Sequence, residues 1–318
     1  MPRALALARL PTPVLPAPRL SDALGVEVWV KRDDLTGLGL SGNKVRKLDF
    51  LLADAVDRGC DCVLTTGGLQ SNHARATAVA CRQLGLEPFL LLRGAIPDVA
   101  DSNLLLDHLL GATLRTCTTE GYRQRDAMLQ AWAEELRAEG RTPCVIPEGG
   151  SCGLGSLGYV RAAAELAHQE APAFDGIVCA VGSGGTLAGL ARGGLDAPVH
   201  GVAVCDDRAT FAARVRTISA EIDAIAPGTP PLGEEGRAWS VVEGYQGAGY
   251  GLAGPEVWDT LQLAARTEGL LLDPVYTAKA LHALRTEARA GRWRGRWLFW
   301  HTGGAFGLFG RGAELARP

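Results

Sequence analysis

The sequence of 318 residues has almost no excess of charge of either sign and no long apolar run. The formal net charge is −3 and the pI is near 6.1, so we expect neither nucleic acid nor an anionic membrane as a partner. Because no run of 18 or more apolar residues occurs, we expect no membrane span. The apolar stretch at residues 4–8 is short and is soon followed by prolines, so no signal peptide is predicted.

The sequence also lacks a paired cysteine motif. Its eight cysteines include no CxxC pair, and only Cys60 and Cys62 lie close together in the chain. Several others interrupt apolar runs that are typical of buried strands. We therefore expect no disulfide framework and no metal site, but buried thiols in a reducing cytoplasm.

Glycine, by contrast, is abundant. The chain has 41 glycines, roughly twice the average share, and they cluster within residues 149–150, 182–185 and 303–304. Because clustered glycines allow the backbone to approach a ligand closely, we expect these segments to border a binding site.

Short apolar runs rich in Val, Ile and Leu alternate with longer segments of helical periodicity. Strands are predicted at residues 26–30, 62–66, 88–92, 113–117, 176–181, 200–204 and 297–301. Helices are predicted at residues 44–58, 72–84, 102–110, 124–138, 157–168, 185–192, 256–268 and 277–290. This alternation predicts an α/β fold in which helical crossovers join parallel strands.

A zone rich in Pro and Gly near residues 141–151 separates two such series. We predict a smaller α/β domain at residues 45–150 and a larger domain that combines residues 1–44 with residues 151–318. Residues 205–240 are predicted to form a helix and an exposed loop.

Lys44 stands at the start of a predicted helix, directly after Ser41-Gly42-Asn43. These three residues are expected to bend the chain and cap the helix. Burial at the positive end of a helix lowers the pKa of an amine, as a lysine that forms a Schiff base requires. Arg46 and Lys47 fit the ordinary pattern of a solvated helix face, and Lys44 taken alone fits it too.

The segment Gly182-Ser183-Gly184-Gly185-Thr186 follows a predicted strand and opens a helix. Its N–H groups can converge on an anion and its hydroxyls add donors, which predicts a phosphate site. It contains no GK[ST] element of a Walker loop. Asp206 follows about 20 residues later, so the dinucleotide site of a nicotinamide-dependent dehydrogenase is an alternative, as is a plain tight turn.

Gln70-Ser71-Asn72-His73 lies between the predicted strand at residues 62–66 and the next helix. Such polar groups either cap the helix or bind a ligand, and open parallel sheets bind ligands at the carboxyl ends of their strands. Three C-terminal segments carry further candidates, each ordinary by itself: Gly249-Tyr250-Gly251, Asp273-Pro274-Val275-Tyr276-Thr277 and His301-Thr302-Gly303-Gly304.

Several motifs follow one another in order over nearly the whole chain: Lys31-Arg32-Asp33-Asp34, residues 41–48, residues 70–73, Gly149-Gly150-Ser151, Leu157-Gly158-Tyr159, residues 272–276 and residues 301–304. Together they resemble the D-cysteine desulfhydrase and 1-aminocyclopropane-1-carboxylate (ACC) deaminase family. These are pyridoxal 5'-phosphate (PLP) enzymes with a two-domain fold like that of tryptophan synthase β. The resemblance implies a parallel sheet in each domain and PLP bound by the larger one.

The resemblance also implies roles for single residues. Lys44 would form the Schiff base with PLP, and Asn72 would bond the phenolic oxygen of the cofactor. The phosphate would be held by the glycine-rich loop: Gly182, Ser183, Gly184, Gly185 and Thr186. Substrate binding is implied for Gln70, Ser71, Asn72, His73 and Ser151. Catalytic roles are implied for Lys44, Ser71, Tyr250 and Tyr276.

Two positions separate the branches of this family. Deaminases typically have Glu and Leu where this chain has Thr277 and Thr302, which are typical of desulfhydrases and are expected to contact the cofactor. A hydroxyl beside the pyridine nitrogen leaves it closer to neutral than a carboxylate does. Loss of a Cα proton and of a good β leaving group needs less electron withdrawal by the cofactor ring than opening a cyclopropane does.

The resemblance therefore favours a lyase that performs α,β-elimination on a small sulfur-containing amino acid. D-cysteine would give pyruvate, ammonia and hydrogen sulfide. L-cysteate sulfo-lyase and ACC deaminase, which makes 2-oxobutyrate and ammonia, are the alternatives within the family. A non-catalytic amino-acid-binding relative is a further alternative. The resemblance also implies a homodimer.

Overall fold

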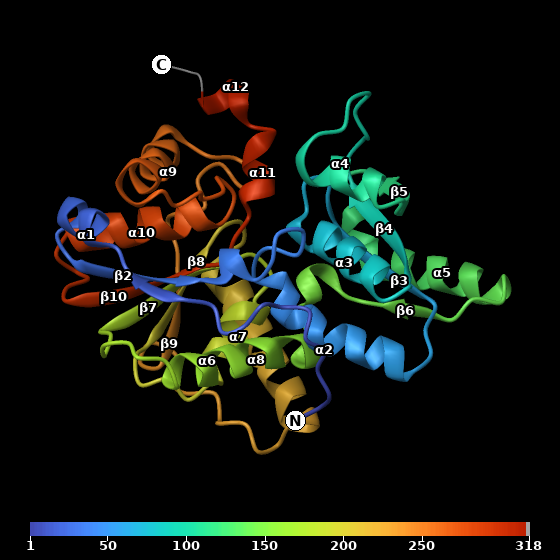
Figure 1. Ribbon diagram of the computed structural model, residues 1–318, viewed down its shortest axis with the longest axis horizontal. Coiled ribbons are helices and arrows are strands. Elements are labelled where there is room, and N and C mark those ends of the chain that lie inside the picture. The colour runs from blue at the N-terminus through green and yellow to red at the C-terminus, as the bar shows by residue number, and fades with distance from the viewer. Residues whose placement is uncertain (316–318) are drawn as a thin grey trace.

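The computed structural model describes residues 1–315, which form two sheets with helices on both faces (Figure 1). The larger sheet has the strand order β1-β2-β10-β7-β8-β9 and the smaller one the order β5-β4-β3-β6. Every strand pair is parallel except β1 with β2. The α/β class and the parallel sheet predicted for each part of the chain are confirmed, apart from that antiparallel edge strand.

The strands of the larger sheet are β1 (Val14–Pro16), β2 (Glu27–Arg32), β7 (Gly176–Val181), β8 (Val199–Ala203), β9 (Trp239–Val242) and β10 (Arg296–His301). Those of the smaller sheet are β3 (Cys62–Gly68), β4 (Glu87–Arg93), β5 (Thr113–Cys117) and β6 (Pro143–Val145). We name each sheet with its packed helices the large-sheet half and the small-sheet half.

The α-helices are α1 (Pro18–Leu24), α2 (Lys44–Asp57), α3 (Asn72–Gln83), α4 (Ser102–Leu109), α5 (Arg125–Ala138), α6 (Gly153–Ala167), α7 (Gly185–Ala191), α8 (Arg208–Ile225), α9 (Pro255–Glu268), α10 (Thr277–Arg289), α11 (Ala305–Phe309) and α12 (Gly312–Leu315). Short 3-10 turns lie at η1 (Asp33–Leu35), η2 (Gly121–Gln124) and η3 (Glu148–Gly150).

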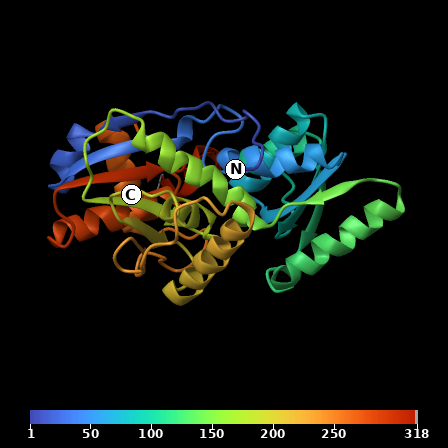
Figure 2. The same cartoon turned by 90° about the horizontal axis from the view of Figure 1, so that it is seen from below.

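Helices cover both faces of each sheet, which explains why the central strands are apolar without alternation. One face of the larger sheet packs on α6, α7 and α8, and the other on α1, α9 and α10. The smaller sheet is covered by α5 on one face and by α2, α3 and α4 on the other. All six residues of β7 are buried as a result. Figure 2 shows α5 at the outer side of the small-sheet half, far from the larger sheet.

Each predicted strand and helix is present, and most of the ends agree within two residues. The exception is α6, which begins four residues earlier, at Gly153. The sequence did not predict β1, β6 or β9. The first two have three residues and contain proline, so they carry almost no periodic signal. The third begins at the end of the predicted exposed loop after α8, but its Trp239 is buried at 1 % exposure.

The strands of the smaller sheet all lie within residues 62–145, and those of the larger sheet lie outside that range. Helix α2 packs along α6 and so connects the halves. We keep domain boundaries at residues 45 and 150 as a proposal. None of the helices within residues 1–315 is both long and apolar enough to cross a membrane. All eight cysteines are free thiols.

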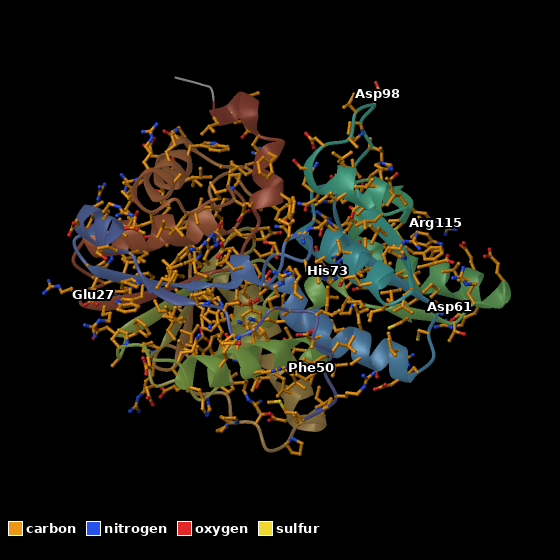
Figure 3. The ribbon with its side chains drawn as sticks, viewed as in Figure 1. Glu27, Phe50, Asp61, His73, Asp98 and Arg115 are labelled. Carbon is orange, nitrogen blue, oxygen red and sulfur yellow. The ribbon has the colours of Figure 1, made fainter. Side chains whose placement is uncertain are left out.

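The functional region lies where carboxyl ends of strands from both sheets face each other. Strand β3 ends at Gly68, β7 at Val181 and β10 at His301, and the residues at or after these ends line one pocket. In Figure 3 the labelled His73, which follows β3, lies between the two halves.

Candidate active site

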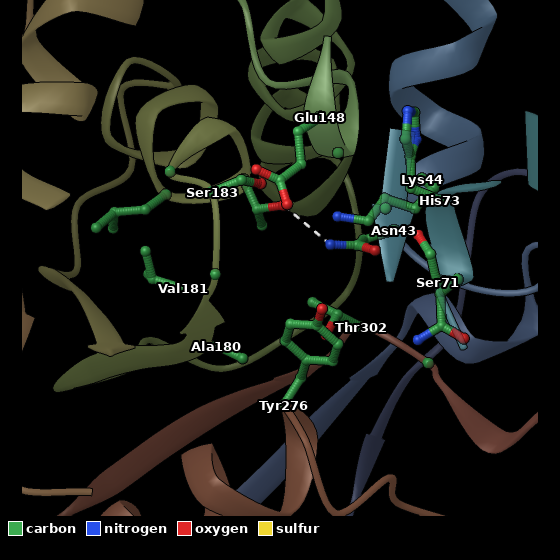
Figure 4. Close-up of a pocket in the computed structure, with 18 of the residues that line it drawn as sticks. Asn43, Lys44, Ser71, His73, Glu148, Ala180, Val181, Ser183, Tyr276 and Thr302 are labelled. Atoms are coloured by element: carbon green, nitrogen blue, oxygen red, sulfur yellow. Dashed lines mark hydrogen bonds between the residues drawn. The ribbon is translucent and has the colours of Figure 1, made fainter. Parts of the chain in front are cut away.

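One pocket between the halves brings together eleven of the predicted site residues: Lys44, Ser71, Asn72, His73, Gly182, Ser183, Gly184, Thr186, Tyr250, Tyr276 and Thr302. In Figure 4, Asn43, Lys44, Ser71 and His73 lie on one side and Ala180, Val181 and Ser183 on the other, with Tyr276 and Thr302 between them. Four predicted residues do not line this pocket: Gln70, Ser151, Gly185 and Thr277.

The turn before Lys44 is docked onto the end of β10. Gly42 has a φ of +104°, and a Cβ there would lie 2.8 Å from the carbonyl oxygen of Thr302, so only glycine fits. The N–H of Asn43 donates to the same carbonyl at 3.0 Å. The predicted side-chain cap by Asn43 is wrong, because its amide donates instead to the hydroxyl of Thr186 at 3.1 Å (dashed line in Figure 4). Asn43 thus connects the lysine turn to the glycine-rich loop.

Burial lowers the pKa of Lys44 to about 8, although the carboxylate of Glu148 opposes the shift. Its Nζ atom has no hydrogen-bond partner among residues 1–315. An amine in this state is neutral in a substantial fraction of molecules near pH 8, which is what addition to an aldehyde requires.

The interpretation of Arg46 as a solvated residue is wrong. Its side chain is 1 % exposed and donates to Asp33 at 2.7 and 2.9 Å and to Glu165 at 2.9 Å. Asp33 also accepts from Tyr159 at 2.7 Å and from Trp300 at 2.8 Å. Burial alone would raise the pKa of Asp33, but Arg46 and these donors hold it below its usual value. This cluster fastens the first turns of α2 to the large-sheet half.

Lys47 is also buried, at 1 % exposure, so its interpretation as a surface residue is wrong too. Because α2 lies between the halves, the face assigned to solvent is covered by protein (Figure 1). Its Nζ donates to the carbonyl of Gly149 at 3.1 Å and to the hydroxyl of Ser151 at 2.8 Å. Burial lowers its pKa well below 10.5, and the nearby Lys44 lowers it further. This amine has no carboxylate partner within residues 1–315.

The glycine-rich loop lies directly over Lys47. A Cβ on Gly185 would lie 2.7 Å from the Lys47 amine and 2.7 Å from the Ser151 hydroxyl. The N–H groups of Ser183, Gly184, Gly185 and Thr186 donate to no acceptor in the part of the chain that the structure describes. Unsatisfied amides beside a buried amine fit a phosphate, because the anion supplies the missing acceptors and favours the charged form of the amine.

The turn after β3 presents side chains rather than amides. Ser71 caps α3, because its Oγ accepts from the N–H of Ala74 at 3.1 Å. Asn72 follows, and its orientation is fixed from behind. Arg75, which can only donate, gives its Nε proton to Oδ1 of Asn103 at 3.2 Å. Asn103 therefore turns its NH2 group to Oδ1 of Asn72 at 3.0 Å, which leaves the NH2 of Asn72 for the pocket.

Gln70 belongs to the same network and points away from the pocket. Its Oε1 accepts from the N–H of Asn103 at 2.9 Å, and its Nε2 donates to the carboxylate of Asp101 at 2.7 Å. It ties the turn to the start of α4.

His73 lines the pocket as a neutral ring. Burial lowers its pKa well below 6.5, and the charges of Lys44 and Lys47 lower it further. Thr65 donates its only hydroxyl proton to the carbonyl of Ile146 at 2.8 Å, so it must accept from Nε2 of His73, also at 2.8 Å. The proton of the ring is therefore on Nε2, and Nδ1 carries a lone pair without a partner among residues 1–315.

The two threonines that separate the family branches differ in their surroundings. Thr302 lines the pocket, and its hydroxyl makes no hydrogen bond within residues 1–315. The hydroxyl of Thr277 accepts from the N–H of Asp273 at 2.8 Å and donates to its carboxylate at 2.7 Å. Thr277 thus serves the start of α10, whereas Thr302 is free to bond a ligand.

Tyr250 and Tyr276 form a further part of the pocket wall, with their hydroxyls 2.6 Å apart and their rings edge to face. Burial raises the pKa of Tyr276 well above 10, and the neighbouring Tyr250 raises it further. The pair therefore offers neutral hydroxyls to the pocket.

Sequence reasoning missed three residues. Asn43 was given a capping role only, Lys47 was assigned to solvent, and Glu148 was not considered although it lines the pocket. Glu148 accepts from the hydroxyl of Tyr122 at 2.9 Å and lies 3.2 Å from Arg125. Its position directly before the pair Gly149-Gly150 was the available signal, because that pair was expected to border a ligand.

The comparisons with known proteins agree with this geometry. The family described as "Pyridoxal-phosphate dependent enzyme" matches residues 5–303. The chain is 42% identical over 315 residues to a putative ACC deaminase of Thermotoga maritima, covering 97% of this chain and 98% of that protein. It is 41% identical over 332 residues to the mitochondrial bifunctional D-cysteine desulfhydrase/ACC deaminase of Arabidopsis thaliana, covering 98% and 80%.

A solved structure of an ACC deaminase homologue has a TM-score of 0.91 and 38% identity to this chain, covering 99% of this chain and 95% of that one. The dehydrogenase alternative is therefore wrong, and Asp206 pairs with Arg214 at 3.0 Å. The chain belongs to the PLP-dependent enzyme family, in the group whose members carry the names D-cysteine desulfhydrase and ACC deaminase.

Proposed function

We propose that this PLP-dependent enzyme is a lyase that performs α,β-elimination on a small sulfur-containing amino acid, foremost D-cysteine. The products would be pyruvate, ammonia and hydrogen sulfide. The observation that carries the choice is the free hydroxyl of Thr302 in the pocket. The only carboxylate that lines this pocket within residues 1–315 is that of Glu148, which Tyr122 and Arg125 engage from the far side.

The residues present fit the cofactor. We assign its phosphate to the amides of residues 183–186 with the Lys47 amine beneath, its phenolic oxygen to the NH2 of Asn72, and its ring nitrogen to Thr302. The free amides, and the buried amine that has no carboxylate partner within residues 1–315, support the first assignment. PLP, when bound, supplies an electron sink for the negative charge that forms at the substrate Cα.

We assign removal of the Cα proton to the Lys44 amine. Its pKa of about 8 supports this role, because a substantial fraction of the amine is neutral near pH 8. Ser71 is a second candidate, but its Oγ already accepts the N–H of Ala74, and so it would serve better as a donor to the substrate carboxylate. The neutral tyrosine pair closes the other side of the site.

A second candidate is ACC deaminase, which is favoured by the names of the relatives. The free hydroxyl at Thr302 counts against it, since opening a cyclopropane profits from a protonated ring nitrogen. L-cysteate sulfo-lyase would use the same site as the proposed reaction and differs only in the leaving group.

The test is a substrate panel on the purified holoenzyme. We expect pyruvate and sulfide from D-cysteine, with slower or no formation of 2-oxobutyrate from ACC and of sulfite from L-cysteate. Borohydride should fix the cofactor to Lys44, and Lys44→Ala should lose both the fixation and the product. Turnover of ACC faster than that of D-cysteine would overturn the choice of reaction while leaving the cofactor assignment in place.

We also propose that the protein is a homodimer of the cytoplasm, on the family resemblance and on its eight free thiols. Light scattering would decide the oligomeric state.

A further inference from the structure

Arg93 ends β4 at the mouth of the candidate active site. Its guanidinium lies between two aromatic rings, 5.0 Å from the centre of Tyr122 and 4.9 Å from that of Tyr250. Stacking on ring faces fixes the plane of a guanidinium and leaves its N–H edges free to donate. Arg93 therefore carries a positioned set of donors.

The space that Arg93 faces adjoins the active-site pocket. Arg93 lines a second cavity, and Asn72, Tyr250 and Tyr276 line both. Strand pairing places Arg93 opposite Gly68, and its Nη2 is 3.9 Å from the position that a Cβ of Gly68 would occupy. A substrate group that lies beside Tyr250 is thus within reach of this guanidinium.

The charge of Arg93 is not balanced by the protein. It makes neither an ion pair nor a hydrogen bond within residues 1–315. The other charged groups of this cavity are occupied: Arg311 pairs with Glu314, Asp101 accepts from Gln70, and Asp273 accepts three backbone N–H groups. Within residues 1–315, Arg93 is therefore the cation of this cavity that has neither a carboxylate partner nor a hydrogen-bond acceptor, and its complement is an anion.

We propose that Arg93 binds the β substituent of the substrate as it departs with negative charge. This inference rests on the proposed function. The Cβ–S bond breaks with its electron pair on sulfur, which leaves as hydrosulfide, while the proton comes off Cα. The balance is D-cysteine plus water to pyruvate, ammonium and hydrogen sulfide. The hydrogen bonds from a guanidinium become stronger as negative charge develops on the sulfur. Arg93 would therefore lower the barrier to breaking the Cβ–S bond.

The α-carboxylate of the substrate is the other anion that could reach Arg93. The two can be told apart, because every amino acid has the carboxylate and only some have a leaving group. D-alanine has none, yet exchange of its Cα proton in D2O still reports binding and proton removal.

The experiment compares Arg93→Gln with Arg93→Lys in the holoenzyme. Both keep a long polar side chain, but only lysine keeps the charge. We expect Arg93→Gln to lower kcat/KM for D-cysteine about 10- to 100-fold and Arg93→Lys to lower it less. Exchange of the D-alanine proton should stay close to wild type in both. Arg115→Ala, one strand further out and paired with Glu135, is the control and should change neither.

Equal losses for D-cysteine elimination and D-alanine exchange would assign Arg93 to the carboxylate and overturn the inference. Unchanged elimination in Arg93→Gln would do the same. A wild-type enzyme that exchanges the D-alanine proton but eliminates from no sulfur amino acid would overturn the proposed function itself.

Discussion

Two turns face each other across the pocket, and they are built in opposite ways. Each joins the carboxyl end of a buried parallel strand to a helix, β3 to α3 and β7 to α7. In the first turn Ser71 caps the helix with its own side chain. In the second the cap position is Gly184, which has no side chain, and the N–H groups from Ser183 to Thr186 stay without protein acceptors.

One fold thus makes two kinds of binding surface. Where a side chain satisfies the helix start, the turn can present further side chains, here Asn72 and His73, to a ligand of varied shape. Where the backbone is left unsatisfied, the turn is suited to one kind of ligand, an anion. The lysine turn connects the two, because Asn43 bonds Thr186 and Lys44 lines the space between them.

The largest expected effect comes from giving the second turn a side chain. The Cβ of Gly185→Ala would lie 3.0 Å or less from Lys47 Nζ and from two atoms of Ser151, so the loop must shift. We expect PLP affinity to fall about 10- to 100-fold, as measured by equilibrium dialysis. Gly228→Ala, with no atom within 4 Å of the added Cβ, is the matched control. Unaltered affinity in Gly185→Ala would mean that the loop does not hold the phosphate.

A smaller effect is expected from disturbing the first turn from behind. In Asn103→Asp the side chain keeps its size but cannot donate to Oδ1 of Asn72, so the Asn72 amide should rotate and turn its oxygen to the pocket. We expect about a tenfold loss of PLP affinity and a shifted visible absorption band. Asn103→Ala removes the bond without repulsion and should shift the band less. An identical band in wild type and Asn103→Asp would contradict the assigned orientation.

Lys44, in the turn that connects the other two, can be tested by varying the pH. The pKa of Lys44 is lowered to about 8, so its neutral fraction rises as the pH increases through 8. The rate of holoenzyme formation from apoenzyme and PLP should fall about fivefold from pH 8 to pH 7. Stopped-flow absorbance measures this rate. A midpoint above pH 10, as for an ordinary lysine, would show that Lys44 is not the desolvated amine described above.

The smallest effect concerns the cap itself. Ser71→Ala removes the acceptor for the N–H of Ala74 and should lower the free energy of unfolding by about 1 kcal/mol. Ser71→Asp keeps an acceptor there and should retain stability in urea titrations. If both variants eliminate as fast as wild type, Ser71 only caps the helix, and Asn72 and His73 carry the function of that turn.

Much of this could be predicted from the sequence, because local patterns determine it. The buried strands have continuous apolar runs, and both turns follow such runs directly, so their meeting at the pocket follows from parallel pairing. The burial of Arg46 and Lys47 could not be predicted, since it depends on α6 and η3, which lie about a hundred residues further on. The position of Thr302 likewise depends on a tertiary contact, with Asn43, whereas Thr277 is held by Asp273 only four residues before it.

The place of β10 in the larger sheet has a consequence for biosynthesis. This strand is made last, yet it lies between β2 and β7, and its end supplies Thr302 and the carbonyl on which Asn43 rests. A nascent chain that still lacks it has neither a continuous larger sheet nor a seated Lys44 turn, even though all strands of the smaller sheet are already made. Cofactor capture should therefore follow the synthesis and insertion of β10, and it marks the chains in which this strand has found its place.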